Sequence, residues 1–242
     1  MRKENFSVGS IVHVYNRGNR KQEIVRDDKD RWYFLQALYY FNNGFSPQNP
    51  FQVLKKELGD DFYTKLIWPD SWHERTPIVK ILAYVLKDNH FHLLLEELKE
   101  GGISKFMKKF GNGLTNRFNT RYKENGQLFQ GSYKAKLVDS DNYLTSLSTY
   151  IQIKNVLELY PGGIKKALEN FDRAYDFACG YKYGSMAIYA KKEDLPILYL
   201  GEDNLIIDLI ADEKEFKEVS KDQLLNLAFD EKTMILKDLI DV

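Results

Sequence analysis

The stretch that decides how this chain can fold is Ile81-Leu-Ala-Tyr-Val-Leu86, Lys87-Asp-Asn89 and His90-Phe-His-Leu-Leu-Leu95. Two apolar runs flank three polar residues, a pattern typical of a β-hairpin. Because alternate side chains of a strand leave the same face, the imidazoles of His90 and His92 can reach one divalent metal ion. The pair supplies only two ligands, so an ordinary strand that happens to carry two histidines is an open alternative.

Elements on both sides of the hairpin can be predicted from residue patterns. Residues 10–16 are rich in β-branched and aromatic side chains, which favours a strand, and 27–41 begin with acidic residues, which favours a helix. Apolar residues recur every fourth position from Phe106 to Phe118, so a helix is expected over 103–122.

The remaining predicted elements are a strand over 128–138, a helix over 141–156 and a mostly helical segment over 161–242. The resulting order of strand, helix, strand, strand, helix, strand predicts an α+β fold of the ferredoxin-like split βαβ type. We expect an antiparallel sheet with helices on one face, followed by a C-terminal helical extension.

Two domains are expected, 1–157 and a helical extension over 158–242. Residues 44–77 hold four of the six prolines and two of the three tryptophans, which indicates an insertion in the first domain with one short helix.

Composition points to a globular protein that does not enter a membrane. Hydrophobic residues make up 43% of the 242 residues and charged residues 29%. No apolar run approaches 18 residues and no signal-peptide core is visible, so we expect a cytoplasmic protein. The only cysteine, Cys179, excludes an internal disulfide and a thiolate metal cluster.

A formal net charge of zero hides a strong asymmetry along the chain. Residues 102–140 carry eight bases against two acids, whereas 193–242 carry 14 acids against five bases. This asymmetry predicts a polyanion-binding region beside an acidic appendage, although two ordinary solvated helix faces would look the same. The acidic tail could also shield the basic region electrostatically.

Basic residues beside aromatic residues suggest a single-stranded or hairpin nucleic acid as partner. The aromatic candidates are Tyr15, Phe129 and Tyr133. The candidate phosphate-binding residues are Arg17, Arg20, Lys21, Arg26, Lys105, Lys108, Lys109, Arg117, Arg121, Lys134 and Lys136.

Several motifs together resemble one known family. Ile11-Val-His-Val-Tyr-Asn-Arg-Gly-Asn19, Arg26-Asp-Asp-Lys-Asp-Arg-Trp-Tyr-Phe-Leu35, His90-Phe-His92 and Asn125-Gly-Gln-Leu-Phe-Gln-Gly131 look like the HUH single-tyrosine transposases. More narrowly, they resemble the REP-associated branch, which is related to small insertion-sequence transposases. Leu137-Val-Asp-Ser-Asp-Asn-Tyr-Leu144 and Tyr150-Ile-Gln-Ile-Lys-Asn-Val156 continue the resemblance.

The resemblance implies a partner, a cofactor and a reaction. Members of this family fold single-stranded DNA ends into hairpins, and a homodimer cuts beside the hairpin through a tyrosine that becomes linked to a 5′ phosphate. Two histidines and a polar side chain hold the metal. By this resemblance, Mg²⁺ or Mn²⁺ is expected at His90 and His92, with Asn119 as third ligand. His13, which matches a family histidine, is expected as a core or sheet-facing residue, with a role as metal ligand as the alternative.

The nucleophile of the family is missing from the frame in which it is expected. Counting from Met107 to Asn119 places Leu114 at the tyrosine position, and a leucine cannot attack a phosphate. Tyr122 lies eight residues later, about 12 Å along a helix, which makes it a poor substitute.

Three functions therefore stay open. The first is a transposase-family protein, or a domesticated DNA- or RNA-binding accessory derived from one, that binds single-stranded or hairpin DNA but is impaired in cleavage and joining because of Leu114. The second is an active transposase or endonuclease that uses another nucleophile, such as Tyr122. The third is an unrelated metal-dependent hydrolase, in which water attacks.

Overall fold

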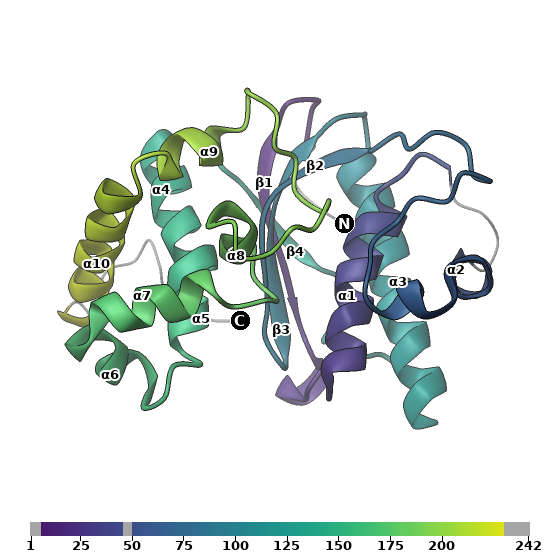
Figure 1. Cartoon of the computed structure of the whole chain (residues 1–242), viewed down its shortest axis with the longest axis horizontal. Helices are drawn as coiled ribbons and strands as arrows, with labels where there is room; N and C mark the ends of the chain where they lie inside the picture. Colours follow the sequence, from purple (N-terminus) through teal and green to yellow (C-terminus); the bar gives the residue numbers. More distant parts are fainter. Residues whose placement is uncertain (1–5, 46–49, 230–242) are drawn as a thin grey trace.

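A four-stranded antiparallel sheet forms the centre of the described part of the chain, residues 6–45 and 50–229 of a computed structural model (Figure 1). The strands are β1 (Ile11–Arg17), β2 (Val79–Leu86), β3 (His90–Glu97) and β4 (Lys134–Leu137), in the order β2-β3-β1-β4. The chain thus has an α+β fold, and the strand order is that of an interleaved βαββαβ unit.

The predicted hairpin is present as β2 and β3. The Lys87 N–H donates to the His90 carbonyl at 2.8 Å, and Asp88 and Asn89 form the turn. In the other direction β3 pairs with β1, which sets Tyr15 opposite His92 and Arg17 opposite His90. Strand β4 is shorter than the predicted 128–138, because residues 128–133 leave the ladder after a single bridge between Gly18 and Phe129.

Two long helices cover one face of the sheet, here called the first face. Helix α1 (Asp28–Phe41) begins after Asp27, whose carboxylate accepts the Asp30 N–H. Helix α3 (Gly102–Tyr122) begins beside the buried carboxylate of Glu97, which accepts the N–H groups of Gly101 and Ile103. Their apolar stripes and the inward side chains of the strands form one core cluster.

The predicted insertion packs on the outer side of α1. Its described residues form one α-helix, α2 (Pro50–Leu58), followed by the 3₁₀ helix η2 (Gly59–Tyr63). The side chains of Trp32 and Gln36 both donate to the Phe62 carbonyl, at 3.1 and 2.7 Å, which attaches the insertion to α1.

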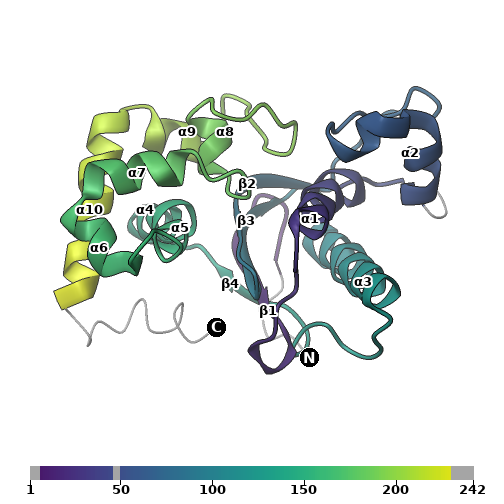
Figure 2. The same cartoon turned by 60° about the horizontal axis from the view of Figure 1, so that its bottom comes forward.

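The other face of the sheet, the second face, is also covered by helices (Figure 2). Their bounds are α4 (Asp141–Thr149), the π-helical turn η3 (Tyr150–Lys154), α5 (Asn155–Leu157), α6 (Gly163–Glu169), α7 (Phe171–Cys179), α8 (Met186–Tyr189), α9 (Leu205–Ile210) and α10 (Glu213–Phe229).

The expectation of helices on one face was therefore incomplete. Strand β2 is buried at all eight positions, so its two faces both need an apolar partner. The outer edge of β2 is covered too, by the segment around Tyr183 and Ser185. The Leu86 N–H donates to the Tyr183 carbonyl, and the Ser185 N–H donates to the Tyr84 carbonyl.

The expected domain boundary after residue 157 stays a prediction, and residues on both sides of it share the second core cluster. The end of the predicted helical tail, 230–242, lies outside the described residues. Among the helices that are described, none combines the length and apolar character needed to cross a membrane.

Candidate histidine and tyrosine site

Three histidines project from β1 and β3 onto the second face of the sheet. His90 and His92 alternate with Phe91, which packs in the core of the first face. His13 lies on the neighbouring strand, with its Nε2 2.9 Å from Nδ1 of His92. His13 and His92 are fully buried, whereas His90 is half-buried at the end of β3. The rings of His90 and His92 are perpendicular, with centroids 5.3 Å apart.

Each β3 histidine uses its Nδ1 in a hydrogen bond with a neighbouring side chain. Nδ1 of His90 donates to the Asn89 side-chain oxygen at 2.6 Å, so Nε2 of His90 carries the lone pair. His92 shares a hydrogen bond with His13 through its Nδ1. Nε2 of His92 is buried and has no hydrogen-bond partner among the described residues.

Burial keeps all three rings neutral at pH 7. Desolvation, together with the nearby Lys136, lowers the pKa of His13 to about 3. Desolvation and Lys87 lower the pKa of His90 to about 4. The pKa of His92 lies well below its usual value because of burial and the two neighbouring histidines. Neutral imidazole is the form that binds a metal ion.

Tyr150 and Asn155 approach the histidines from the helical layer. The Tyr150 ring meets His92 edge-on, with centroids 5.2 Å apart, and is buried. Asn155 is a hydrogen-bond partner of both the Tyr150 phenol and the His90 ring. Burial raises the pKa of Tyr150 above its ordinary value, so the phenol is protonated at neutral pH.

A π-helical turn brings Tyr150 and Asn155 together. The backbone N–H of Asn155 and its side-chain Nδ2 both donate to the Tyr150 carbonyl, the latter at 2.9 Å. This i→i+5 pattern aligns two residues that a regular α-helix would place on different sides. Such turns occur frequently at functional sites.

Basic side chains surround the half-buried end of this site. Lys87 and Lys154 both pair with Glu158, which neutralises part of their charge. Arg17 and Lys134 lie on the same face of the sheet as the histidines, at β1 and β4 positions next to Tyr15 and His90. This side of the site thus favours an anionic ligand.

The structure does not bring the predicted α3 residues to the histidines. Leu114 is buried in the core of the first face with Phe110 and Phe118, across the sheet from His92. The Asn119 amide donates to the Gly126 carbonyl at 3.0 Å. The Tyr122 hydroxyl donates to Asp30 at 2.6 Å, and burial and Asp30 raise its pKa to about 12.

The predicted phosphate-binding residues fall into distinct groups. Only three of them, Arg17, Lys134 and Lys136, lie on strands with side chains toward the second face. Arg26 pairs with Glu124, and Arg121 pairs with Asp27 and Asp30, so these two hold the ends of α1 and α3 together.

The other predicted phosphate-binding residues lie away from the histidines. Lys105 and Lys109 donate to the carbonyls of Gly44 and Asn43. Arg20 and Lys21 are exposed in the turn after β1, Lys108 is exposed on α3, and Arg117 lies on α3 beside the insertion.

The donor set of the site fits a divalent metal ion only if an amide takes part. The described residues contain no cluster of three or more His, Cys, Asp or Glu that could hold a metal. The buried, unpartnered Nε2 of His92, Nε2 of His90 and the side-chain amide of Asn155, which is a hydrogen-bond partner of the His90 ring, provide a mixed nitrogen and oxygen set.

One feature of the sequence points to Tyr150 and Asn155. Both lie in the segment Tyr150–Val156, which is one of the motifs that resemble the transposase family, whereas spacing from Met107 points to position 114 instead. A tyrosine followed by an asparagine five residues later is not recognisable as a site without the π-helical turn.

Comparison with known proteins gives one family match. Residues 45–154 match the family model of IS200-like transposases. No curated protein matches the chain. A solved structure of a REP-associated tyrosine transposase bound to a REP hairpin is similar over 84% of this chain and 91% of that chain, with 12% identity and a TM-score of 0.46.

Proposed function

We propose that the chain, whose residues 45–154 match the family model of IS200-like transposases, cuts and rejoins single-stranded or hairpin DNA with Tyr150 as nucleophile. The observation that carries this proposal is the gathering of His90, His92, Tyr150 and Asn155 on the second face of the sheet. His90 and His92 lie on β3 and Tyr150 lies in the π-helical turn η3, all within the matched segment, whereas Asn155 is the first residue of α5 and directly follows that segment.

His90 and His92 would hold Mg²⁺ or Mn²⁺ through Nε2, with the Asn155 amide oxygen as third protein ligand. The ion would offset negative charge on the phosphate oxygens. Manganese accepts mixed nitrogen and oxygen ligands more readily than magnesium does, so Mn²⁺ should bind more tightly. His13 would not bind the ion itself. It would orient the His92 ring through the hydrogen bond that the two histidines share.

Tyr150 would perform the covalent step. Its phenol oxygen forms a bond to the scissile phosphorus while the bond between phosphorus and the neighbouring 3′ oxygen breaks. The phenol proton is lost, and the departing 3′ oxygen takes up a proton to become a hydroxyl. The 5′ phosphate stays on the tyrosine, and attack by a 3′ hydroxyl reverses the step and rejoins the strand.

Leu114 has no part in this proposal. The expectation of impaired cleavage depended on Leu114 standing beside the histidines, and α3 instead packs that side chain into the opposite face. Arg17, Lys134 and Lys136 are proposed to contact the DNA backbone. A homodimer remains a prediction, which light scattering of the purified protein can test.

Incubation of the purified protein with a labelled hairpin of single-stranded DNA and Mn²⁺, followed by a denaturing gel, tests the proposal. Wild-type protein should give a cut strand and a slowly migrating covalent adduct. Tyr150→Phe should give neither, and Tyr122→Phe, its matched control on α3, should behave as wild type. Loss of the adduct in Tyr122→Phe alone would contradict the assignment.

Two further results would favour other functions. Cleavage by Tyr150→Phe without any adduct would indicate attack by water, as in a hydrolase. Binding of the hairpin by wild type with neither product would indicate an accessory DNA-binding protein.

A further inference from the structure

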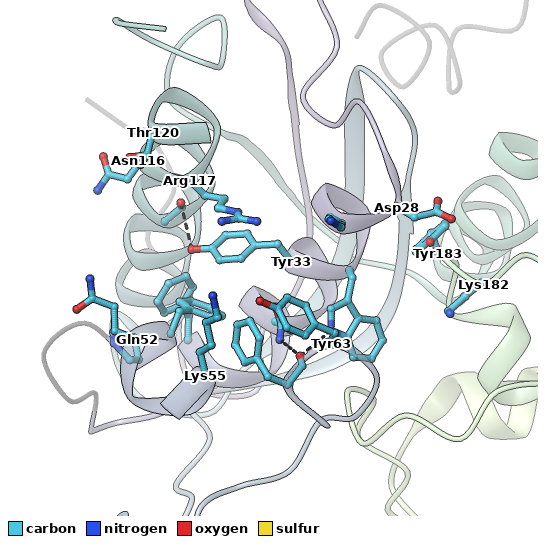
Figure 3. A pocket seen from close by; sticks show the side chains of 18 residues that line it. Asp28, Tyr33, Gln52, Lys55, Tyr63, Asn116, Arg117, Thr120, Lys182 and Tyr183 are labelled. Carbon is cyan, nitrogen blue, oxygen red and sulfur yellow. Dashed lines mark hydrogen bonds between the residues drawn. The ribbon is translucent and has the colours of Figure 1, made fainter. Parts of the chain in front are cut away.

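A cavity of about 730 Å³ lies between α1, α3 and the insertion, away from the histidines (Figure 3). Its walls come from α1, from α2 and η2, and from α3, with Lys182 and Tyr183 at one border. Since α1 and α3 cover the first face of the sheet, the sheet separates this cavity from the proposed metal site. Its volume lies within the range of about 300–1,000 Å³ that is typical of small-molecule sites.

Aromatic side chains form much of the wall. Trp32 and Phe62 are buried, and the Trp32 indole and the Gln36 amide both donate to the Phe62 carbonyl. These hydrogen bonds fix the wall in place without a ligand. Tyr63, by contrast, keeps 46% of its surface exposed and offers a ring to an incoming planar group.

Positive charge surrounds the same cavity. Its charged lining residues are Lys29, Lys55, Lys182 and Arg117, against Asp28 as the single carboxylate. The Arg117 guanidinium lies 5.4 Å from the centre of the Tyr33 ring. Arg117 lines the cavity, and Nε of its guanidinium has no hydrogen-bond partner among the described residues.

We propose that this cavity binds one nucleotide, with the base against the aromatic wall and the phosphate at Arg117 and Lys55. An apolar ligand would make no use of the basic side chains, and a simple anion would make no use of the aromatic wall. The amides of Gln36, Gln52 and Asn116 line the cavity and can bind the polar edge of a base.

The nucleotide is an unpaired one from a DNA strand, a source that depends on the proposed function. Base stacking on aromatic side chains combined with basic groups is how proteins hold single strands. Such a site would hold DNA at a distance from the cleavage site, on a surface built partly by the insertion.

The test uses the full chain in a Tyr150→Phe background with EDTA, so that neither cleavage nor a metal ion contributes. One probe is an unstructured oligo(dT) with a single 2-aminopurine, and the other is free dTMP. The variants are Tyr63→Ala and Lys55→Gln. Their controls are Phe177→Ala, an exposed aromatic residue on α7, and Lys56→Gln, an exposed neighbour on α2 outside the cavity.

Tyr63→Ala should weaken oligonucleotide binding about 5- to 100-fold, the usual effect of one stacked base, and should reduce the change in 2-aminopurine fluorescence. Lys55→Gln should weaken binding and lower the salt dependence by about one phosphate contact. Both control variants should bind as the parent does.

Unchanged binding of both probes to Tyr63→Ala and Lys55→Gln would overturn the proposal. Loss of dTMP binding with unchanged oligonucleotide binding would overturn the strand as source and leave a free nucleotide as ligand. Because no metal is present, this result is independent of whether the histidine site cuts DNA.

Discussion

Lowering the pH from 7 to 5 should destabilise the metal-free protein by about 2 kcal/mol for each of His13 and His90. An unfolded histidine has a pKa of about 6.5, so at pH 5 it binds a proton. His13, with a native pKa of about 3, and His90, with a native pKa of about 4, do not. The unfolded state therefore holds more protons, and the free energy of unfolding falls as the pH falls.

The size of the effect follows from the two pKa values. Protonation at 1.5 pH units below a pKa of 6.5 stabilises the unfolded state by about 2 kcal/mol per histidine. Stability is lost from about pH 6.5 downward, and for His90 the loss ends near pH 4. Carboxylates also change the free energy of unfolding with pH. The change between pH 7 and pH 5 should therefore be compared between wild type and variants that keep the same carboxylates.

Urea unfolding in EDTA at pH 7 and pH 5 measures this effect. His13→Asn removes one buried neutral ring, so its stability should fall by about 2 kcal/mol less than that of wild type over this interval. His73→Asn, at an exposed position, should follow wild type. An equal loss in wild type and His13→Asn would show that His13 is protonated in the native state, and would refute the reasoning.

Two further predictions concern packing and metal binding. Gly113→Ala should lower the free energy of unfolding by about 1–3 kcal/mol, because its Cβ would overlap the Phe41 ring, whereas Gly111→Ala, with open space around it on the same helix, should be neutral or stabilising. Chemical denaturation measures both, and equal stabilities would contradict the packing. Asn155→Ala should weaken Mn²⁺ binding at least about tenfold by calorimetry, while Asn119→Ala should leave it unchanged. Weaker binding by Asn119→Ala and unchanged binding by Asn155→Ala would instead support Asn119 on α3 as the metal ligand.

Much of the sheet and of the helices on its first face could be predicted because their signals are local. Alternation and turn residues identify the hairpin, and the fourfold apolar spacing identifies α3. The helical cover of the second face could not be predicted in the same way. Its contacts join β2 and β3 to residues from Tyr143 to Leu224, and no local pattern reports on such long-range pairing.

Of the candidate site residues, His90 and His92 could be predicted from the sequence, whereas Tyr150 and Asn155 could not. His90 and His92 share a strand, so their spacing alone places them together. Tyr150 meets them only through the packing of a different element, and its alignment with Asn155 depends on a π-helical turn. Leu114 stands at the position where the resembled family has its tyrosine. Its burial with the other apolar side chains of α3 explains why a leucine is found there, without reference to catalysis.

Identification of the residue that carries the DNA tests the central claim most directly. Trypsin cleavage after Lys136 and Lys154 releases residues 137–154, which contain Tyr143 and Tyr150, while Tyr122 leaves in the dipeptide Tyr122-Lys123. After reaction with hairpin DNA and Mn²⁺, mass spectrometry with fragmentation should locate the 5′-phosphonucleotide on Tyr150. An adduct on Tyr122 or Tyr143, or cut DNA with no protein adduct, would contradict the account.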